Sequence, residues 1–221
     1  MKIQVVIDVE MCKVQMKAYN YPYKNEIIQI GAVKMDENYE ILDSFSTYVK
    51  PRYGKIDHFI DRMTGISERN LKGAPDIEDA LLKMLQWIGD DETVFYSWST
   101  TDYNQIRNEI RFKCRDDVNW GLLLNQENWI DYQERLGARL ESQRSLKLSD
   151  ALELVEIDTK GRAHDGLDDA YNTACMIAKL EQNKDYKTLV ERLRANEENQ
   201  KPLTTTLGQL LKGLSLEPDE P

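Results

Sequence analysis

Two acidic residues near the start of the chain have the spacing of a metal-binding pair. Asp8 and Glu10 lie in a short apolar, β-branched run that begins at Val5, and such a run predicts a buried strand. Because side chains alternate across a strand, the two carboxylates point to the same face. Neighbouring carboxylates repel each other and lose hydration, so they require a compensating cation, and a hard divalent ion such as Mg²⁺ or Mn²⁺ suits oxygen ligands. The alternative is a strand end at which both acids reach solvent.

A third acid, Asp102, is predicted at a junction between a strand and a helix. Residues 93–98 form an apolar run typical of a buried strand, and residues 99–101 offer N-cap side chains for the helix that follows. Asp102 therefore lies in the first helical turn, at the edge of the sheet. An acid in that position also interacts favourably with the helix dipole, which is the alternative explanation for it.

A second informative segment, residues 161–170, carries His164 and two adjacent aspartates. Gly166 allows a turn or unusual backbone angles there. Asp169 lies next to a stripe of small residues that would let the following helix approach the sheet closely. The stripe consists of Ala170, Ala174 and Ala178. Asp169 can therefore point its carboxylate at a metal on the sheet, whereas Asp168 lies about 100° round the helix and is interpreted as a first-turn acid.

The apolar pattern predicts the elements that would position these residues. Three strands with short turns, the first at the start of the chain and the others over residues 26–33 and 40–49, predict an antiparallel meander. Apolar residues at helical spacing predict a helix over residues 77–88. A short strand over residues 128–131 is expected to run into a further helix.

The domain organisation follows from a change of composition late in the chain. Residues 56–66 mix polar and apolar side chains around a glycine and predict a loop, in which His58 is a surface histidine. Residues 1–182 are expected to form one α/β domain, and residues 183–221 a C-terminal helical, partly disordered tail. We expect that tail to be able to hold a protein partner or a dimer contact.

Composition and charge exclude several classes of protein. The chain has 221 residues, 41% of them hydrophobic, and a net charge of −10. No apolar run approaches the roughly 20 residues of a membrane helix, and the immediate strand argues against a signal peptide. Three cysteines without a CxxC spacing argue against a disulfide framework or a zinc site, so a reducing, cytoplasmic location is expected. The acidic charge argues against coating long duplexes, but a few nucleotides could still bind through local lysines and a metal.

Aromatic and basic residues alternate between residues 12 and 25. Tyrosines such as Tyr23, interleaved with lysines, could stack on bases while the lysines contact phosphate. The same residues could equally form a surface connection whose tyrosines pack on the sheet. The pattern alone does not separate these interpretations.

In chain order, the acids and the histidine resemble the motifs of the DEDDh 3′–5′ exonucleases, the DnaQ-like branch of the RNase H-like superfamily. The motifs are Ile7-Asp8-Val9-Glu10, Trp98-Ser99-Thr100-Thr101-Asp102, and His164 followed five residues later by Asp169. Residues 26–33 and 64–66 also resemble that family, and the resemblance covers about residues 1–182. The chain is most similar to the KapD-like and RNAi-enhancer or histone-mRNA exonucleases. It departs from them at Met11 and Cys12, where that branch commonly has a small residue and a threonine.

The resemblance implies a fold and a site. The fold would be an RNase H-like mixed sheet, an antiparallel meander of three strands plus parallel strands, flanked by helices. Asp8, Glu10 and Asp169 would hold two Mg²⁺ or Mn²⁺ ions, with Asp102 supporting the second partly through water. His164 would be the general base, carried on a mobile loop that Gly166 helps to set. The substrate-binding residues would include Met11, Cys12, Tyr23 and Trp98.

The implied activity is metal-dependent 3′–5′ exonuclease hydrolysis at the 3′ end of single-stranded nucleic acid, with RNA favoured over DNA. Two ions that clamp the attacking and leaving oxygens suit phosphodiester hydrolysis, and an imidazole suits proton transfer at neutral pH. Two alternatives remain. One is a proofreading or repair exonuclease that acts on DNA, and the other is a non-catalytic nucleic-acid-binding protein on the same fold.

Overall fold

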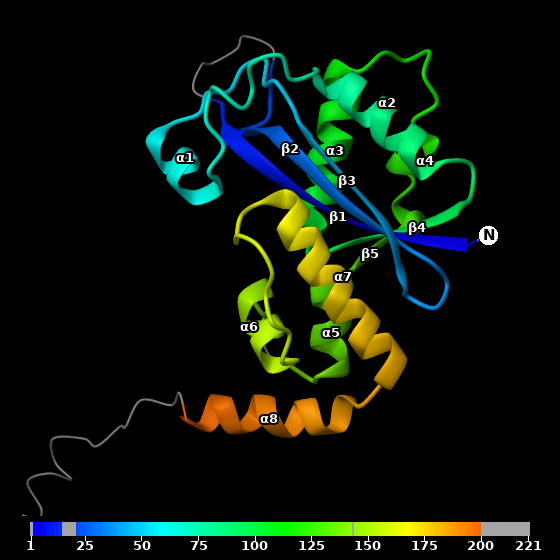
Figure 1. Cartoon of the computed structure of the whole chain (residues 1–221), viewed down its shortest axis with the longest axis vertical. Helices are drawn as coiled ribbons and strands as arrows, with labels where there is room; N and C mark the ends of the chain where they lie inside the picture. The colour runs from blue at the N-terminus through cyan, green and yellow to red at the C-terminus, as the bar shows by residue number, and fades with distance from the viewer. Residues whose placement is uncertain (1, 15–20, 143, 200–221) are drawn as a thin grey trace, which may run out of the picture.

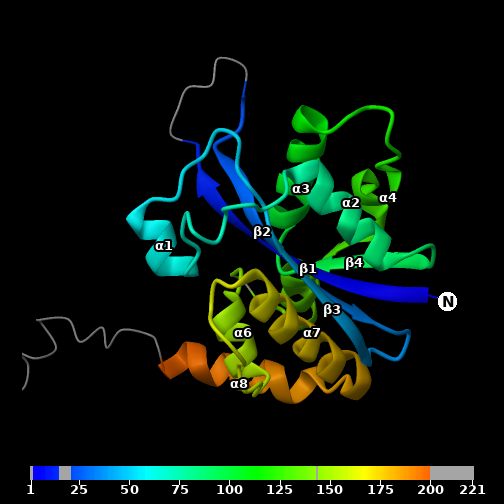
Figure 2. The same ribbon diagram turned by 45° about the horizontal axis from the view of Figure 1, so that its top comes forward.

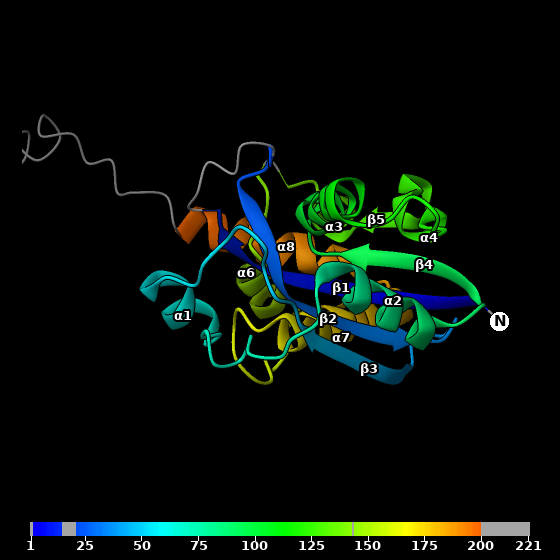
Figure 3. The same cartoon turned by 90° about the horizontal axis from the view of Figure 1, so that it is seen from above.

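A five-stranded mixed sheet forms the centre of the protein, and helices lie on both sides of it (Figure 1). The computed structural model describes residues 2–14, 21–142 and 144–199. The strands are β1 (Lys2–Lys13), β2 (Asn25–Met35), β3 (Ile41–Tyr48), β4 (Glu92–Ser97) and β5 (Trp129–Asp131). Their spatial order is β3-β2-β1-β4-β5, and Figure 3 shows β4, β1, β2 and β3 following one another across the sheet. Strands β1 to β3 are antiparallel, whereas β4 is parallel to β1 and to β5, so the predicted fold class is confirmed.

The helices divide between the two faces according to the alternation of side chains along β1. Ile3, Val5 and Ile7 pack in one buried cluster with the helices of the first face, and Val6 packs in another with those of the second. The helices of the first face are α2 (Ile77–Ile88), α3 (Thr100–Lys113) and α4 (Gly121–Leu124), which is followed by the short 3₁₀ helix η1 (Gln126–Asn128). Those of the second face are α5 (Tyr132–Arg139), α6 (Leu148–Leu154), α7 (Gly166–Asn183) and α8 (Tyr186–Asn199).

One segment predicted to be a loop contains a helix. Within residues 56–66 the structure has α1 (His58–Thr64), which lies beside the end of β1 remote from the N-terminus (Figure 2). The Asp57 side chain caps it by accepting bonds from the backbone N–H groups of Phe59 and Ile60, and Gly65 ends it at a φ of 72°. The loop prediction was wrong because these two caps stabilise a helix too short to show apolar periodicity. His58 is exposed, as expected.

Two glycines let the first turn of α7 rest directly on the sheet. A Cβ atom on Gly31 would lie 2.1 Å from the backbone carbonyl carbon of Gly166. A Cβ on Gly166 would lie 3.1 Å from the carbonyl oxygen of Asp8. Neither glycine has a positive φ. The expectation of unusual backbone angles at Gly166 was therefore wrong, and its missing side chain serves close packing instead.

The small-residue stripe continues this contact along α7. Ala170 and Ala174 are completely buried, and Ala178 is half-buried further along the helix. Close approach of α7 to β1 and β2 brings the acids of its first turn to the strand that carries Asp8. The packing of the fold thereby positions the candidate site.

Replacing Gly31 with alanine is expected to destabilise the protein by about 3 kcal/mol or more, because the new methyl group would meet backbone that cannot move aside. A matched control is Gly137→Ala in α5, where nothing lies within 4 Å of the added atom. The control should raise stability by up to about 1 kcal/mol, since alanine favours a helix. Urea unfolding of both variants provides the measurement. A stable Gly31→Ala protein would contradict the packing described for α7.

The C-terminal segment extends the core of the second face. Leu189 and Leu193 of α8 are buried in the same cluster as residues of α5 to α7. The boundary at residue 182 stays a prediction, and the predicted disorder near the C-terminus falls outside the described residues. Within the described part of the chain, no helix has the length and apolar character needed to cross a membrane.

Candidate active site

Strand β1 presents Asp8 and Glu10 to the first turn of α7. Both lie on the face that carries Val6, which packs with α7, and the Gly166 backbone lies against Asp8. Asp8 is half-buried, and Glu10 is 7% exposed. The pair is therefore enclosed between sheet and helix, so the alternative of two solvated acids at a strand end does not hold.

Asp102 reaches the same strand from the other side. The parallel pairing of β1 with β4 ends at Val6 and Tyr96, which leaves the next residues of β1 without a strand partner on that edge. Ser99 caps α3, and the buried Asp102 in its first turn accepts a hydrogen bond from the backbone N–H of Val9 at 3.0 Å. The Asp102 carboxylate thus accepts the backbone hydrogen bond that a neighbouring strand would otherwise accept from Val9, the residue between the two β1 acids.

His164 and Asp169 complete the cluster. The backbone N–H of His164 donates to Asp169 Oδ2 at 2.8 Å, and His164 has a φ of 63°. One ligand atom from each of Glu10, His164 and Asp169 lies within 4.8 Å of the other two. His164 is exposed and Asp169 half-buried, so the imidazole lies at the solvent rim of an otherwise enclosed acidic site.

Two residues of this region were not predicted. Asp165 caps α7 with one oxygen, which accepts from Leu167 N and Asp168 N, and its other oxygen accepts from Gln29 Nε2 at 3.2 Å. Gln29 Oε1 accepts in turn from Gly166 N at 3.0 Å. An N-cap search would have found Asp165. Gln29 gives no local signal, because its role depends on the contact between β2 and α7.

Burial raises the pKa values of all four site acids, and at Asp8 and Glu10 repulsion from neighbouring site carboxylates adds to it. Burial is the first cause in each case, and it raises the pKa of Glu10 and of Asp102 to about 7. For Asp8, whose pKa lies well above its ordinary value, the charges of Asp102 and Glu10 add to burial. The pKa of Asp169 is also raised. Four clustered carboxylates therefore carry a large electrostatic cost when ionised.

Within the residues that the structure describes, no cationic side chain pairs with these acids to offset that cost: neither lysine nor arginine forms an ion pair with Asp8, Glu10, Asp102 or Asp169. Hard divalent ions suit a site that is rich in carboxylate oxygens and has no positively charged side chain beside it. A bound ion stabilises the ionised carboxylates and so lowers their pKa values again. The donor set fits Mg²⁺ or Mn²⁺, and the acids together with His164 are the residues that would surround the ions.

The raised pKa values predict how the metal-free protein responds to pH. The pKa of Glu10 is about 7 in the folded chain, against an ordinary 4.5. The protonated Glu10 side chain is therefore favoured by folding. Its contribution to the free energy of unfolding is complete below pH 4.5 and is lost as the pH rises through 7, a change of roughly 3 kcal/mol. We expect the metal-free protein to melt at a lower temperature at pH 8 than at pH 5.5, and Mg²⁺ to raise the Tm more at pH 8. Thermal melts in EDTA and in Mg²⁺ test this. A Mg²⁺ effect of equal size at both pH values would contradict it.

The loop that carries His164 is fastened to α1. Arg162 Nη2 donates to the carbonyl oxygens of Arg62 at 2.7 Å and Met63 at 3.4 Å, near the C-terminus of α1. A Cβ on Gly65 would lie 1.8 Å from Arg162 Nη1, so this glycine makes room for the guanidinium. Asp168 Oδ2 accepts from the Arg162 backbone N–H at 2.7 Å. The mobility predicted for this loop remains a prediction, but the contacts hold it at two points.

Of the four predicted substrate-binding residues, Cys12 has the least access to solvent. It is 1% exposed and packs with Ile28 and Ile60, and burial above all raises the pKa of its thiol to about 12. A nucleotide has no surface of Cys12 to contact, so this part of the prediction was wrong, because the strand end is covered by α1. The assignments of the other three remain predictions.

The other three candidates are half-buried. Met11 packs against the cluster on the face opposite Asp8 and Glu10. Trp98 packs against the second-face cluster, and its carbonyl accepts from the backbone of α5. Tyr23 packs edge-on against Tyr21 and Phe112. In the described part of this segment, Tyr21 and Tyr23 pack against each other and against Phe112 of α3 instead of on the sheet, and part of Tyr23 is accessible. Residues 15–20 lie outside the described residues, and the stacking interpretation stays a prediction.

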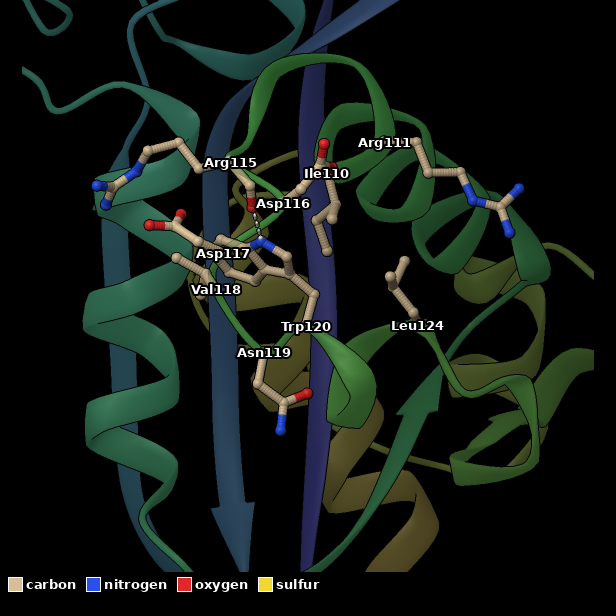
Figure 4. A pocket seen from close by; sticks show the side chains of 9 residues that line it. All are labelled: Ile110, Arg111, Arg115, Asp116, Asp117, Val118, Asn119, Trp120 and Leu124. Carbon is tan, nitrogen blue, oxygen red and sulfur yellow. Dashed lines mark hydrogen bonds between the residues drawn. The ribbon is translucent and has the colours of Figure 1, made fainter.

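A separate concave region lies on the first face. A groove of about 470 Å³ lies between the C-terminal end of α3 and α4 (Figure 4), and Arg111, Asp117 and Trp120 are among its lining residues. The indole N–H of Trp120 donates to the carbonyl of Arg115 at 3.0 Å. None of the site acids lines this groove. This groove is therefore separate from the candidate site at the junction of β1, α3 and α7.

Comparison with known proteins agrees with this geometry. Residues 5–177 match the family model described as Exonuclease (RNase_T). The chain is 30% identical over 202 residues to ERI1 exoribonuclease 2 of Mus musculus, a match that covers 80% of this chain and 28% of the relative. It is 48% identical over 63 residues to DNA polymerase III PolC-type of Caldanaerobacter subterraneus, covering 28% of this chain and 4% of that protein.

A solved structure shares the fold. The nuclease domain of 3′hExo, described as a DEDDh family member bound to rAMP, superposes with a TM-score of 0.65 at 24% identity, covering 82% of this chain and 92% of that one. The present chain spans less than a third of the length of the two sequence relatives named above. The match over residues 5–177 includes the five residues that the structure brings together. The chain therefore belongs to the exonuclease (RNase_T) family, and it shares the fold of a solved DEDDh nuclease domain.

Proposed function

We propose that the protein removes nucleotides from the 3′ end of single-stranded RNA by phosphodiester hydrolysis with two divalent metal ions. The observation that carries this proposal is the set of four clustered carboxylates with a histidine at their rim. In the part of the chain that the structure describes, no lysine or arginine forms an ion pair with them. When bound, Mg²⁺ or Mn²⁺ supplies an activated water and stabilises charge on the phosphate and the leaving oxygen. The names of the exoribonuclease relatives support RNA as the substrate.

The residues of the site divide the remaining work. Asp8, Glu10 and Asp169 would hold the ions, and Asp102, anchored to the β1 backbone, would support them. His164 is placed to accept the proton of the attacking water, because its ring lies at the exposed rim within reach of Glu10 and Asp169. The bond from the His164 backbone to Asp169 fixes the base relative to a metal ligand.

A second candidate is hydrolysis of DNA ends. The match to a DNA polymerase over 63 residues favours it. Matched RNA and DNA oligomers of one sequence, labelled at the 5′ end and incubated with Mg²⁺ or Mn²⁺, separate the two. We expect stepwise shortening of both oligomers from the 3′ end, with RNA cut faster than DNA. Faster cleavage of DNA would support the second candidate, and binding of both without cleavage would point to a non-catalytic protein.

We call the hydrogen bonds from the Arg162 guanidinium to the carbonyls of Arg62 and Met63 the Arg162 latch. Removing these bonds should lower turnover and leave the metal ligands in place. We expect Arg162→Ala to lower kcat by about 10-fold, because the loss of one charge-assisted contact of about 1.4 kcal/mol frees the His164 loop. Arg162→Lys should recover part of the loss, since an ammonium can still donate to one of the carbonyls. Steady-state kinetics with Mn²⁺ titration separates the effects. Wild-type turnover in Arg162→Ala, or a matching loss of Mn²⁺ affinity, would show that the latch does not position the base.

A further inference from the structure

A cluster of cationic side chains lies at and beyond the C-terminal end of β1, the end that carries the acids. We name it the basic rim; it consists of Lys13, Lys50, Arg52, Lys55 and Lys72. All five are exposed, and none forms an ion pair in the part of the chain that the structure describes. The chain as a whole carries a net charge of −10. A local excess of positive charge on an acidic protein identifies a surface suited to an anionic partner.

The backbone places part of the rim on the same edge of β1 as Asp102. Successive residues of a strand direct their N–H and C=O groups to opposite edges, so Val9 and Lys13 share an edge. On that edge Val9 donates to Asp102, and the Lys13 carbonyl accepts from Lys55 N at 3.4 Å. Four residues of strand span about 13 Å. The rim thus begins roughly that far from the acidic site, and Figure 2 shows the segment between β3 and α1 beside this end of β1.

The lysines line a groove. Lys50, Lys55 and Lys72 surround a concave region of about 450 Å³, and Glu68 is the one acid among its lining residues. The Lys50 N–H donates to the Pro75 carbonyl, which joins the segment after β3 to the one before α2. The lining of the groove therefore carries a net positive charge.

Buried contacts hold the rim in place. The Glu26 carboxylate accepts from the backbone N–H groups of Arg52 at 2.9 Å and Tyr53 at 2.7 Å, and also from that of Gly54. Lys113 pairs with Glu26 in the interior, so this acid does not neutralise the surface. Three backbone bonds to one buried carboxylate fix the segment that presents Arg52 and Lys55. The cations are thus presented on a rigid support, which lowers the cost of binding.

We propose that the basic rim binds the phosphates of the nucleic-acid strand on the 5′ side of the scissile bond. This inference rests on the proposed function, because it places the 3′ end at Asp8 and Glu10. The acids need metal ions to accept one phosphate, whereas the rim can contact phosphates directly. The acidic remainder of the surface limits the contact to a few nucleotides, so the rim favours single-stranded substrates longer than those that reach only the acidic site.

The test compares the triple variant Lys50→Glu/Lys55→Glu/Lys72→Glu with the control Lys83→Glu/Lys147→Glu/Lys187→Glu. The control alters three exposed lysines that do not line the groove: Lys83 in α2, Lys147 just before α6 and Lys187 in α8. Fluorescence anisotropy in EDTA gives the Kd for a labelled 15-nucleotide RNA without hydrolysis. Steady-state kinetics in Mg²⁺ gives the KM for that RNA and for a dinucleotide.

We expect the rim variant to raise the Kd and KM for the 15-mer by about 10- to 100-fold, with the dinucleotide and the control variant changed less than about 3-fold. The slope of log Kd against log salt should fall by roughly 2, since each of three lost single-strand contacts contributes about 0.7. Equal losses for the 15-mer and the dinucleotide, or an unchanged slope, would overturn the inference. Each of the single variants Lys50→Glu, Lys55→Glu and Lys72→Glu should raise the Kd by about 2- to 5-fold. These single variants test the inference if the triple variant does not fold.

The outcomes for the rim and for the proposed function can be distinguished. If the wild type binds the 15-mer through the rim but cuts neither substrate in Mg²⁺, the proposed hydrolysis fails. The rim is then a nucleic-acid site without the reaction, and the inference about its direction fails with it. If both substrates are cut and the rim variant behaves as the control does, the proposed function stands and the rim inference fails.

Discussion

Replacing Asp8 with asparagine is expected to lower turnover by about 10³-fold or more and to raise the Tm of the metal-free protein at pH 8. Asp8 lies among three other acids, and its pKa is raised by burial first and then by the charges of Asp102 and Glu10. The substitution keeps the shape of the side chain and removes the charge that a metal ion would use. It also removes one source of repulsion from the metal-free site, so activity and stability should change in opposite directions.

The control for this variant is Asp90→Asn, which makes the same charge change at an exposed position of the turn between α2 and β4. It should leave both turnover and Tm near their wild-type values. Kinetics in Mg²⁺ and melts in EDTA measure the two effects. Loss of activity together with a lowered Tm would mean that Asp8 supports the fold rather than a metal site.

Replacing His164 with alanine is expected to lower kcat by about 10²- to 10⁴-fold, which is the usual contribution of a general base. Metal affinity should change by less than about 10-fold, because Asp8, Glu10, Asp102 and Asp169 all remain. The backbone N–H of residue 164 would still donate to Asp169, so the loop keeps that contact. Added imidazole should restore part of the lost turnover if the missing group is a proton acceptor.

The chain's other histidine, His58, provides the control, since it is exposed at the start of α1. His58→Ala should keep wild-type turnover. Calorimetric Mn²⁺ titrations, compared with the kinetics, show whether His164→Ala loses the base or a ligand. If Mn²⁺ affinity falls as far as kcat, the role of His164 is metal binding and not proton transfer.

The sequence was sufficient to predict those parts of the site that depend on local pattern. Alternation along β1 placed Asp8 and Glu10 on one face, and the capped start of α3 placed Asp102 beside them. The order of the three motifs indicated the family, which the match over residues 5–177 confirms. The meander and the two parallel strands were predicted from apolar runs, because burial of a sheet leaves a strong signal in sequence.

What the sequence did not reveal depends on contacts between distant segments. The packing of Gly31 against Gly166 and the bridge from Gln29 to Asp165 exist only once α7 lies on β2. Helix α1 was not predicted because it is too short to show apolar periodicity, and its two caps stabilise it instead. The burial of Cys12 follows from that helix, which covers the end of the strand. Such features need the three-dimensional arrangement, since no residue nearby in sequence encodes them.

The most direct test of the central claim follows a 5′-labelled single-stranded RNA over time with protein stripped by EDTA and then given Mg²⁺ or Mn²⁺. We expect intact RNA in EDTA and a ladder of products shortened one nucleotide at a time from the 3′ end once metal is restored. The Asp8→Asn protein should leave the RNA intact under both conditions. Degradation that continues in EDTA, or intact RNA with wild-type protein shown by calorimetry to have bound metal, would contradict the assignment of these acids as a hydrolytic metal site.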